Sequence, residues 1–163
     1  MRVAYVGPYF MSGQSLITTK EIATGIKTAD DINKPDFSVG VTDGTTSEIS
    51  ARGMMPKARI VVKKTLAEVL DLMLQGKVMG VITDYPTASV VALQYRDKGI
   101  ISLKPFTVEP VGIAIRPDDF LFVNLMQNFL NMLQINGQLQ AMTNRWFENP
   151  WWLNQLPAMY QFL

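Results

Sequence analysis

Short apolar runs recur along the chain, and each is bounded by glycine, proline or small polar residues. Runs of this length, rich in valine, isoleucine and threonine, are typical of β-strands rather than of helices. The pattern predicts strands over residues 3–6, 14–19, 37–41, 59–63, 79–83 and 111–116.

Helical patterns separate several of these strands. Apolar residues at helical spacing predict a helix over residues 65–76 that ends at Gly76, a second over 86–99 that begins at Pro86, and a shorter one over 46–54. A threonine followed three positions later by an acid indicates a capping box. This pairing occurs at Thr28 and Asp31, Thr45 and Glu48, and Thr65 and Glu68. Strands that alternate with helices predict an α/β fold with a mostly parallel, helix-flanked sheet.

After residue 116 the alternation stops, and two helices are predicted over residues 120–135 and 137–147, joined at Asn136-Gly137. The window 120–135 is the most apolar of the chain, but asparagine and glutamine interrupt it. It is also shorter than the ~20 residues that a membrane span requires. We therefore expect a core-facing helix and no membrane span.

The amino-acid composition excludes several classes of function. The chain has 163 residues, of which 48% are hydrophobic and 18% charged, so it is globular and forms one domain or two small lobes. A net charge of +1 without a basic block argues against a nucleic-acid partner. Cysteine and histidine are both absent, which excludes the zinc, thiol and histidine-dependent triad chemistries. No metal and no cofactor are expected, and the first ten residues do not form a signal peptide.

Residues 41–48, "VTDGTTSE", place a strand directly before a helix. Such a junction gathers unpaired N–H groups in front of the positive end of the helix dipole, where an anion binds. Gly44 allows a ligand to approach the backbone, and Thr45 and Thr46 add hydroxyl donors. The segment therefore predicts a site for a ligand carboxylate, although an ordinary capped helix has the same pattern.

Asp84 lies at a second strand end, just before the helix that Pro86 begins. Its carboxylate is suited to a ligand ammonium group, or alternatively to capping the helix. An anion site and an acid at two strand ends together describe a binding site for an α-amino acid.

Five segments in order resemble the later part of an extracellular solute-binding protein of family 3, the type II periplasmic amino-acid receptors of ABC importers. They are "VAYVGPYFMSGQSLIT", "IKTADDINKPDFSVGVTDGTTSE", "TLAEVLDLMLQGKVMGVITDYPTA", "PVGIAIRPDD" and "NGQLQAMTNRWF". The combination spans residues 3–147, nearly the whole chain, although no single segment is specific.

The resemblance implies two lobes that close on a ligand and are joined by two crossing strands. Its expected divisions are a first crossing segment in 1–19, lobe 2 in 20–105, a second hinge strand in 106–116, and C-terminal helices of lobe 1 with an aromatic tail in 117–163. It places Gly44, Thr45 and Thr46 in the carboxylate-binding turn and Asp84 at the ammonium site. Ser12 and Gly13 fall in the crossing segment "PYFMSG" and join the predicted ligand-binding residues.

The chain departs from the family pattern before "PYF". There the family has a stretch that supplies a stacking aromatic, a backbone and hydroxyl site, and an arginine that holds the carboxylate. Arg2 is too close to Tyr5 to replace that arginine. We therefore expect a truncated form that lacks the N-terminal half of lobe 1 and retains half of the site. Met79-Gly80 also replaces the usual acid-alanine pair, with an expected effect on packing rather than binding.

Without the rest of lobe 1, the apolar faces of the last two helices would lie exposed. The aromatic and apolar tail adds to this surface, with Trp146, Phe147, Trp151, Trp152, Leu153, Leu156, Met159, Tyr160, Phe162 and Leu163. Either a second copy covers it, for example in a domain-swapped dimer that exchanges the terminal helices, or the helices fold back on their own chain. Burial favours the homodimer.

The leading interpretation is a non-enzymatic solute-binding component for an amino acid or similar polar solute. By resemblance its partners are the membrane subunits of an ABC transporter, and its location is periplasmic or extracellular. The alternatives are a sensory ligand-binding domain, a ligand-free remnant that acts as a dimerisation module, and a dehydratase-like enzyme.

Overall fold

The computed structural model describes residues 2–148 and 151–152. Among them, residues 13–107 form one compact unit, and residues 2–12 with 108–148 and 151–152 form another. The chain passes from one unit to the other at Ser12-Gly13 and at Thr107-Val108. The predicted strands and helices all lie within these two units.

A five-stranded sheet forms the centre of unit 13–107. Its strands are β2 (Gln14–Thr19), β3 (Ser38–Thr42), β4 (Arg59–Lys63), β5 (Gly80–Asp84) and β6 (Ile100–Ser102), in the order β4-β3-β5-β2-β6. β3 pairs in parallel with β4 and β5, and β2 pairs antiparallel with β5 and β6. All strands except β2 thus run in one direction, which confirms the predicted α/β fold with a mostly parallel sheet.

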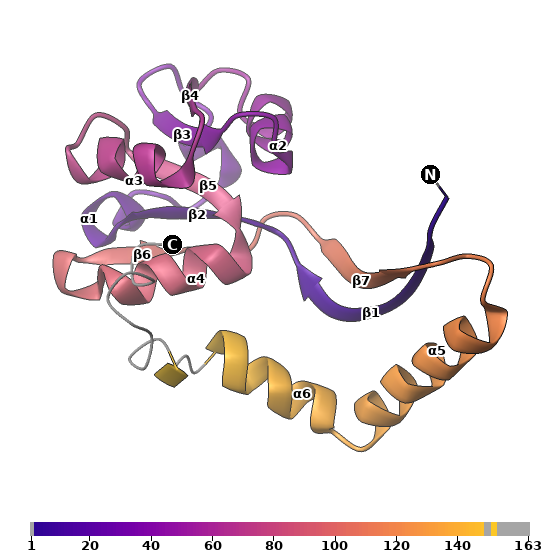
Figure 1. Ribbon diagram of the computed structural model, residues 1–163. Coiled ribbons are helices and arrows are strands. Elements are labelled where there is room, and N and C mark those ends of the chain that lie inside the picture. Colours follow the sequence, from indigo (N-terminus) through magenta and orange to yellow (C-terminus); the bar gives the residue numbers. More distant parts are fainter. Residues whose placement is uncertain (1, 149–150, 153–163) are drawn as a thin grey trace. The chain divides into compact units, whose positions relative to one another are not determined.

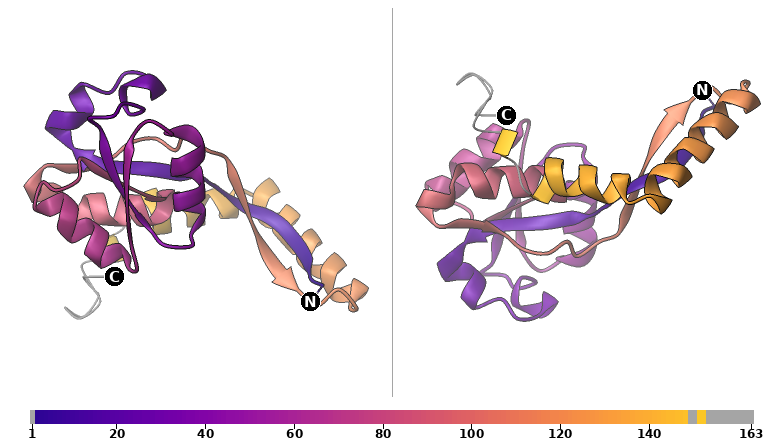
Figure 2. Two further views of the ribbon diagram at one scale, coloured as in Figure 1. Left: turned by 90° about the horizontal axis from the view of Figure 1, so that it is seen from above. Right: turned by 90° about the horizontal axis from the view of Figure 1, so that it is seen from below.

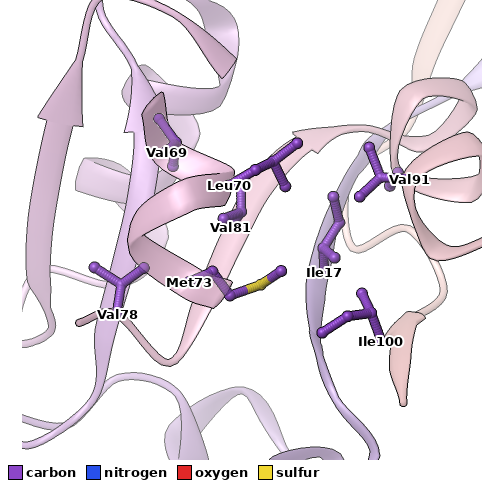
Figure 3. Packing of buried hydrophobic residues seen from close by; sticks show 9 residues of the cluster. Ile17, Val69, Leu70, Met73, Val78, Val81, Val91 and Ile100 are labelled. Atoms are coloured by element: carbon purple, nitrogen blue, oxygen red, sulfur yellow. The ribbon is translucent and has the colours of Figure 1, made fainter. Parts of the chain in front are cut away.

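Helices cover both faces of this sheet (Figure 1). They are α1 (Lys20–Thr24), α2 (Thr46–Met54), α3 (Leu66–Leu74) and α4 (Tyr85–Gln94), with short 3-10 turns at η1 (Ala29–Asp31) and η2 (Arg96–Lys98). Successive strand residues point to opposite faces. Ile17 and Val81 therefore join the core cluster under α3 and α4 (Figure 3), while Leu16 and Ile82 join the cluster that includes Ala51 of α2.

Two glycines allow these layers to approach closely. A Cβ atom at Gly40 would lie 2.2 Å from Cγ1 of Val69 in α3, and one at Gly80 would lie 2.8 Å from the carbonyl oxygen of Ile17. Gly40 therefore lets α3 pack directly on β3, and Gly80 lets β5 lie beside β2. Gly80, the second residue of the Met79-Gly80 pair noted in the sequence, thus has a packing role.

Element boundaries follow the predictions with local exceptions. The predicted helix over 86–99 ends at Gln94 and continues as η2, after which Gly99 adopts a left-handed conformation (φ +73°). β6 and α1 were not predicted; they have three and five residues, too few to show a clear period. The Thr65 capping box is present in full, with the side chains of Thr65 and Glu68 each bonded to the other's backbone N–H.

The other unit contains a two-stranded antiparallel sheet and the C-terminal helices. β1 (Ala4–Ser12) pairs with β7 (Glu109–Ile115), and α5 (Phe120–Ile135) lies along this pair (Figure 2). Val6 of β1 is buried against Leu130 and Leu133 of α5. The predicted helix over 137–147 is α6 (Gln138–Thr143), which continues as a π-helical turn, η3 (Asn144–Glu148).

Part of the aromatic tail can be placed. The rings of Phe10 and Phe147 lie 4.5 Å apart, and those of Trp146 and Trp152 lie 5.8 Å apart. The predicted tail residues from Leu153 onward lie outside the described residues. Within the described ranges, no helix combines the length and the apolar character needed to cross a membrane.

Candidate functional site

Two neighbouring parallel strands lead into helices at the same edge of the sheet. β3 pairs with β5, α2 follows β3 after a short turn, and α4 follows β5 directly. Because parallel strands end at a common edge, the N-termini of α2 and α4 lie at that edge. In open α/β sheets this is where ligands bind.

Several donors and acceptors of the turn before α2 are hydrogen-bonded to other groups of the same turn. The Thr45 hydroxyl donates to the carbonyl oxygen of Thr42 at 2.7 Å and accepts from the Glu48 N–H at 3.4 Å. Gly44 adopts a left-handed conformation (φ +67°), and its N–H donates to the Glu48 carboxylate at 3.0 Å. The Gly44 N–H and the Thr45 hydroxyl, which belong to the predicted carboxylate-binding turn, are therefore bonded within the turn.

Glu48 is charged and held in place. Its carboxylate accepts hydrogen bonds from Arg52 one turn later, with the shorter at 2.8 Å. The Arg52 guanidinium and the Gly44 N–H together hold the pKa of Glu48 below its ordinary value. The sequence predicted that this acid would reach back to the N–H of Thr45, and it bonds to Gly44 instead. Among the described residues, the N–H groups of Thr46 and Ser47 have no partner and remain available to an anion.

Gln14 connects the two strand ends and was not predicted as a site residue. Its side chain is buried; the amide nitrogen donates to the Thr46 hydroxyl at 3.2 Å, and the amide oxygen accepts from the Ser47 hydroxyl at 2.6 Å. In the sheet, Gln14 lies directly opposite Asp84. Since the Thr46 oxygen accepts from Gln14, the Thr46 hydroxyl proton can be donated to a ligand. The feature of the sequence that could have identified Gln14 is its polar side chain at the start of the strand predicted over 14–19.

Asp84 is the N-cap of α4. One carboxylate oxygen accepts from the N–H and the hydroxyl of Thr87, at 3.1 and 2.9 Å, and the other accepts from Thr83 at 3.3 Å. The capping interpretation of Asp84 is thus confirmed. Among the described residues, the second oxygen accepts a single long bond, so a role in binding an ammonium group stays a prediction.

Ser12 and Gly13 lie where the chain passes between the two units. Ser12 is buried and pairs with Glu109 at the end of β1. The Gly13 carbonyl accepts from the N–H of Tyr85 at 2.8 Å, and a Cβ atom at Gly13 would lie 2.1 Å from the carbonyl oxygen of Thr107. Gly13 therefore holds the residue after Asp84 in place, and its lack of a side chain is a packing requirement.

We expect Gln14→Ala to destabilise unit 13–107, because the buried Ser47 hydroxyl loses its acceptor. Leaving a buried polar group unpaired costs about 1–3 kcal/mol. Urea unfolding of Gln14→Ala, Ser47→Ala and the double variant measures the coupling. Strictly additive single-variant effects would contradict the role of this hydrogen bond.

No family model matches the chain, but several individual proteins have similar sequences. The glutamate/aspartate import solute-binding protein of Escherichia coli is 26% identical over 155 residues, which is 91% of this chain and 50% of the relative. The glutamine-binding protein of a Bacillus subtilis ABC transporter is 25% identical over 86% of this chain and 50% of its own length. A cyclohexadienyl dehydratase of Pseudomonas aeruginosa is 25% identical over 92% of this chain and 56% of its own length.

Two solved structures extend this likeness. An ancestral cationic amino-acid solute-binding protein is 35% identical, with a TM-score of 0.76, over 90% of this chain and 62% of that protein. A protein described as a binding component of an ABC transporter from Wolinella succinogenes, in complex with lysine, is 30% identical. Its TM-score is 0.81 over 94% of this chain and 66% of that protein.

The fold and the strand-end site define a type II periplasmic-binding-protein architecture. The predicted resemblance is confirmed: the chain corresponds to the C-terminal part of an extracellular solute-binding protein of family 3. It spans about half the length of the curated relatives that it matches.

Proposed function

We propose that the chain binds a small α-amino acid at the edge where β3 and β5 end. The ligand carboxylate lies against the first turn of α2, where it accepts from the N–H groups of Thr46 and Ser47 and from the Thr46 hydroxyl. The ligand ammonium group lies at Asp84. One observation carries this proposal: Gln14 bonds to Thr46 and Ser47 through its side chain and lies opposite Asp84 in the sheet.

The site supplies opposite charges in separate places. The start of α2 offers N–H donors at the positive end of a nine-residue helix, which favours an anion. Asp84 offers a carboxylate, which favours a cation, and no lysine or arginine is paired with it among the described residues. A zwitterion with its two charges a short distance apart matches both positions.

The relatives support an amino-acid ligand and suggest which to test first. Two of the relatives are named for glutamate and aspartate or for glutamine; of the two solved structures, one is of a cationic amino-acid solute-binding protein and the other is a complex with lysine. We infer on this basis a solute-binding component of an ABC-type transport system that works in the periplasm or outside the cell. Its homodimer stays a prediction.

A thermal-shift screen against the twenty amino acids, followed by calorimetry on each ligand that stabilises the protein, tests the proposal. We expect stabilisation by at least one of lysine, arginine, glutamate, aspartate or glutamine. The absence of any shift and of any binding heat would overturn it, and would favour a ligand-free dimerisation module.

An enzyme is the second candidate, favoured by the likeness to a cyclohexadienyl dehydratase. The protein samples used for the amino-acid screen can also be assayed for enzyme activity, which distinguishes the two functions. Incubation with a cyclohexadienyl acid, followed by analysis for a dehydrated aromatic product, would show turnover. Binding of an amino acid that is recovered unchanged supports the solute-binding function.

A further inference from the structure

Helix α5 is apolar on two opposite faces. One face, which includes Leu130 and Leu133, is buried against β1. The other carries large apolar side chains that are exposed, with Leu121 at 85% and Ile135 at 87%. None of the 16 residues of α5 is charged. One apolar face is enough to hold a surface helix on its domain, so the second apolar face of α5 is available to another partner.

The exposed face has the spacing of a helix-pairing seam. We define the α5 stripe as Leu121, Leu125, Asn128, Met132 and Ile135, which follow one another at intervals of four, three, four and three residues. This is the heptad spacing at which two helices pack side by side. Phe120, Phe122 and Phe129 are exposed beside the stripe and widen it.

We propose that the α5 stripe pairs with the α5 stripe of a second copy of this chain. Asn128 lies at the middle of the stripe, with Leu121 seven residues before it and Ile135 seven residues after it. The uncharged apolar side chains on both sides of Asn128 can meet the same side chains of a second copy, as a two-fold interface requires. The stripe has no charge that would repel a second copy or attract a charged partner. The Asn128 amide nitrogen donates to the Asn124 side chain at 2.6 Å, and its second N–H and its oxygen can bond to the Asn128 of the second copy.

The apolar side chains of the stripe, with Phe129, are 46% to 87% exposed. A standard interface takes roughly 800 Å2 from each partner, so we expect these side chains to form the centre of the buried surface. Asn128 at its centre costs some stability and selects one register of pairing, as polar residues do in helix seams. The stripe and the amino-acid edge belong to different units.

Sedimentation velocity of the full chain over a wide concentration range tests the proposal. We expect a dimer for the natural chain, and at least a tenfold weaker dimer for Leu125→Glu and Met132→Glu. Gln134→Glu is the matched control, because it adds the same charge to the same helix away from the stripe, and it should dimerise like the natural chain. A monomer at all concentrations, or equal dimerisation of stripe and control variants, would overturn the proposal.

A cross-linking experiment avoids any effect of the glutamate variants on folding. The chain has no cysteine, so Asn128→Cys introduces a single thiol at the centre of the stripe. Mild oxidation should join two copies at this position, whether the paired helices run parallel or antiparallel. Gln134→Cys should cross-link far less, and equal cross-linking at both positions would contradict the proposed interface.

Discussion

Asp84→Asn should lower amino-acid affinity by about thirtyfold or more, since removing one member of a buried or half-buried charge pair costs about 2–5 kcal/mol of binding free energy. The fold should change little, because asparagine is as good an N-cap as aspartate and can accept the Thr87 N–H bond. Calorimetry with the tightest ligand from the amino-acid screen gives the affinity, and thermal unfolding of the same samples reports on stability.

Asp119→Asn is a matched control for this experiment. Asp119 also caps a helix, accepting from the N–H of Phe122 at 2.9 Å, but it lies in the other unit. The Asp119→Asn substitution should leave the affinity for the amino acid unchanged. Asp84→Ala loses the cap as well as the charge, and should lose about 1 kcal/mol of stability in addition. If Asp84→Asn binds its ligand as tightly as the natural chain, Asp84 has only the capping role.

Gly13→Ala should be the most destabilising single-methyl change in the described structure. The new Cβ would lie 2.1 Å from the Thr107 carbonyl oxygen and 3.0 Å from Cβ of Pro105. Backbone atoms cannot rotate away as a side chain can, so the strand connections on both sides must move apart. We expect a loss on the order of 3 kcal/mol in the free energy of unfolding, the upper range for overpacking, measured by urea titration.

Gly53→Ala adds the same methyl group without a clash. Apart from its chain neighbours and the backbone of its own helix, no atom lies within 4 Å of a Cβ at Gly53, which is a helical position in α2. Alanine is favoured over glycine there by about 0.5–1 kcal/mol, so this variant should be slightly more stable than the natural chain. Equal stability of the two variants would show that residues 12–14 and 105–107 can separate without cost.

Long, strongly patterned elements could be predicted from the sequence. β2, β4, α2 and α5 have the expected bounds, because each combines a clear period with distinct end signals. β6 could not be predicted, since its three residues follow Gly99 at what looked like a helix end. Local pattern also does not reveal strand order, so the position of β2 between β5 and β6 required the structure.

In the candidate site, too, local features could be predicted from the sequence and tertiary contacts could not. The strand-to-helix junctions at Thr46 and Asp84 follow from local sequence, because capping residues are recognisable from their spacing. The part played by Gln14 arises from tertiary pairing across 32 and 33 residues with Thr46 and Ser47, which no local pattern records. The bonds that occupy Gly44 and Thr45 likewise depend on where the Glu48 carboxylate points within the folded turn.

The position of β2 has a consequence for how the protein acquires its fold. Thr18 pairs with Gly80, and Ile17 pairs with Ser102, separations of 62 and 85 residues. β2 is therefore made early during synthesis but has no pairing partner until β5 has left the ribosome. Until then its apolar run is an unpaired strand that other chains can join. Slow, late closure of the sheet around β2 should limit the folding rate of unit 13–107, as expected when contacts join distant parts of a chain.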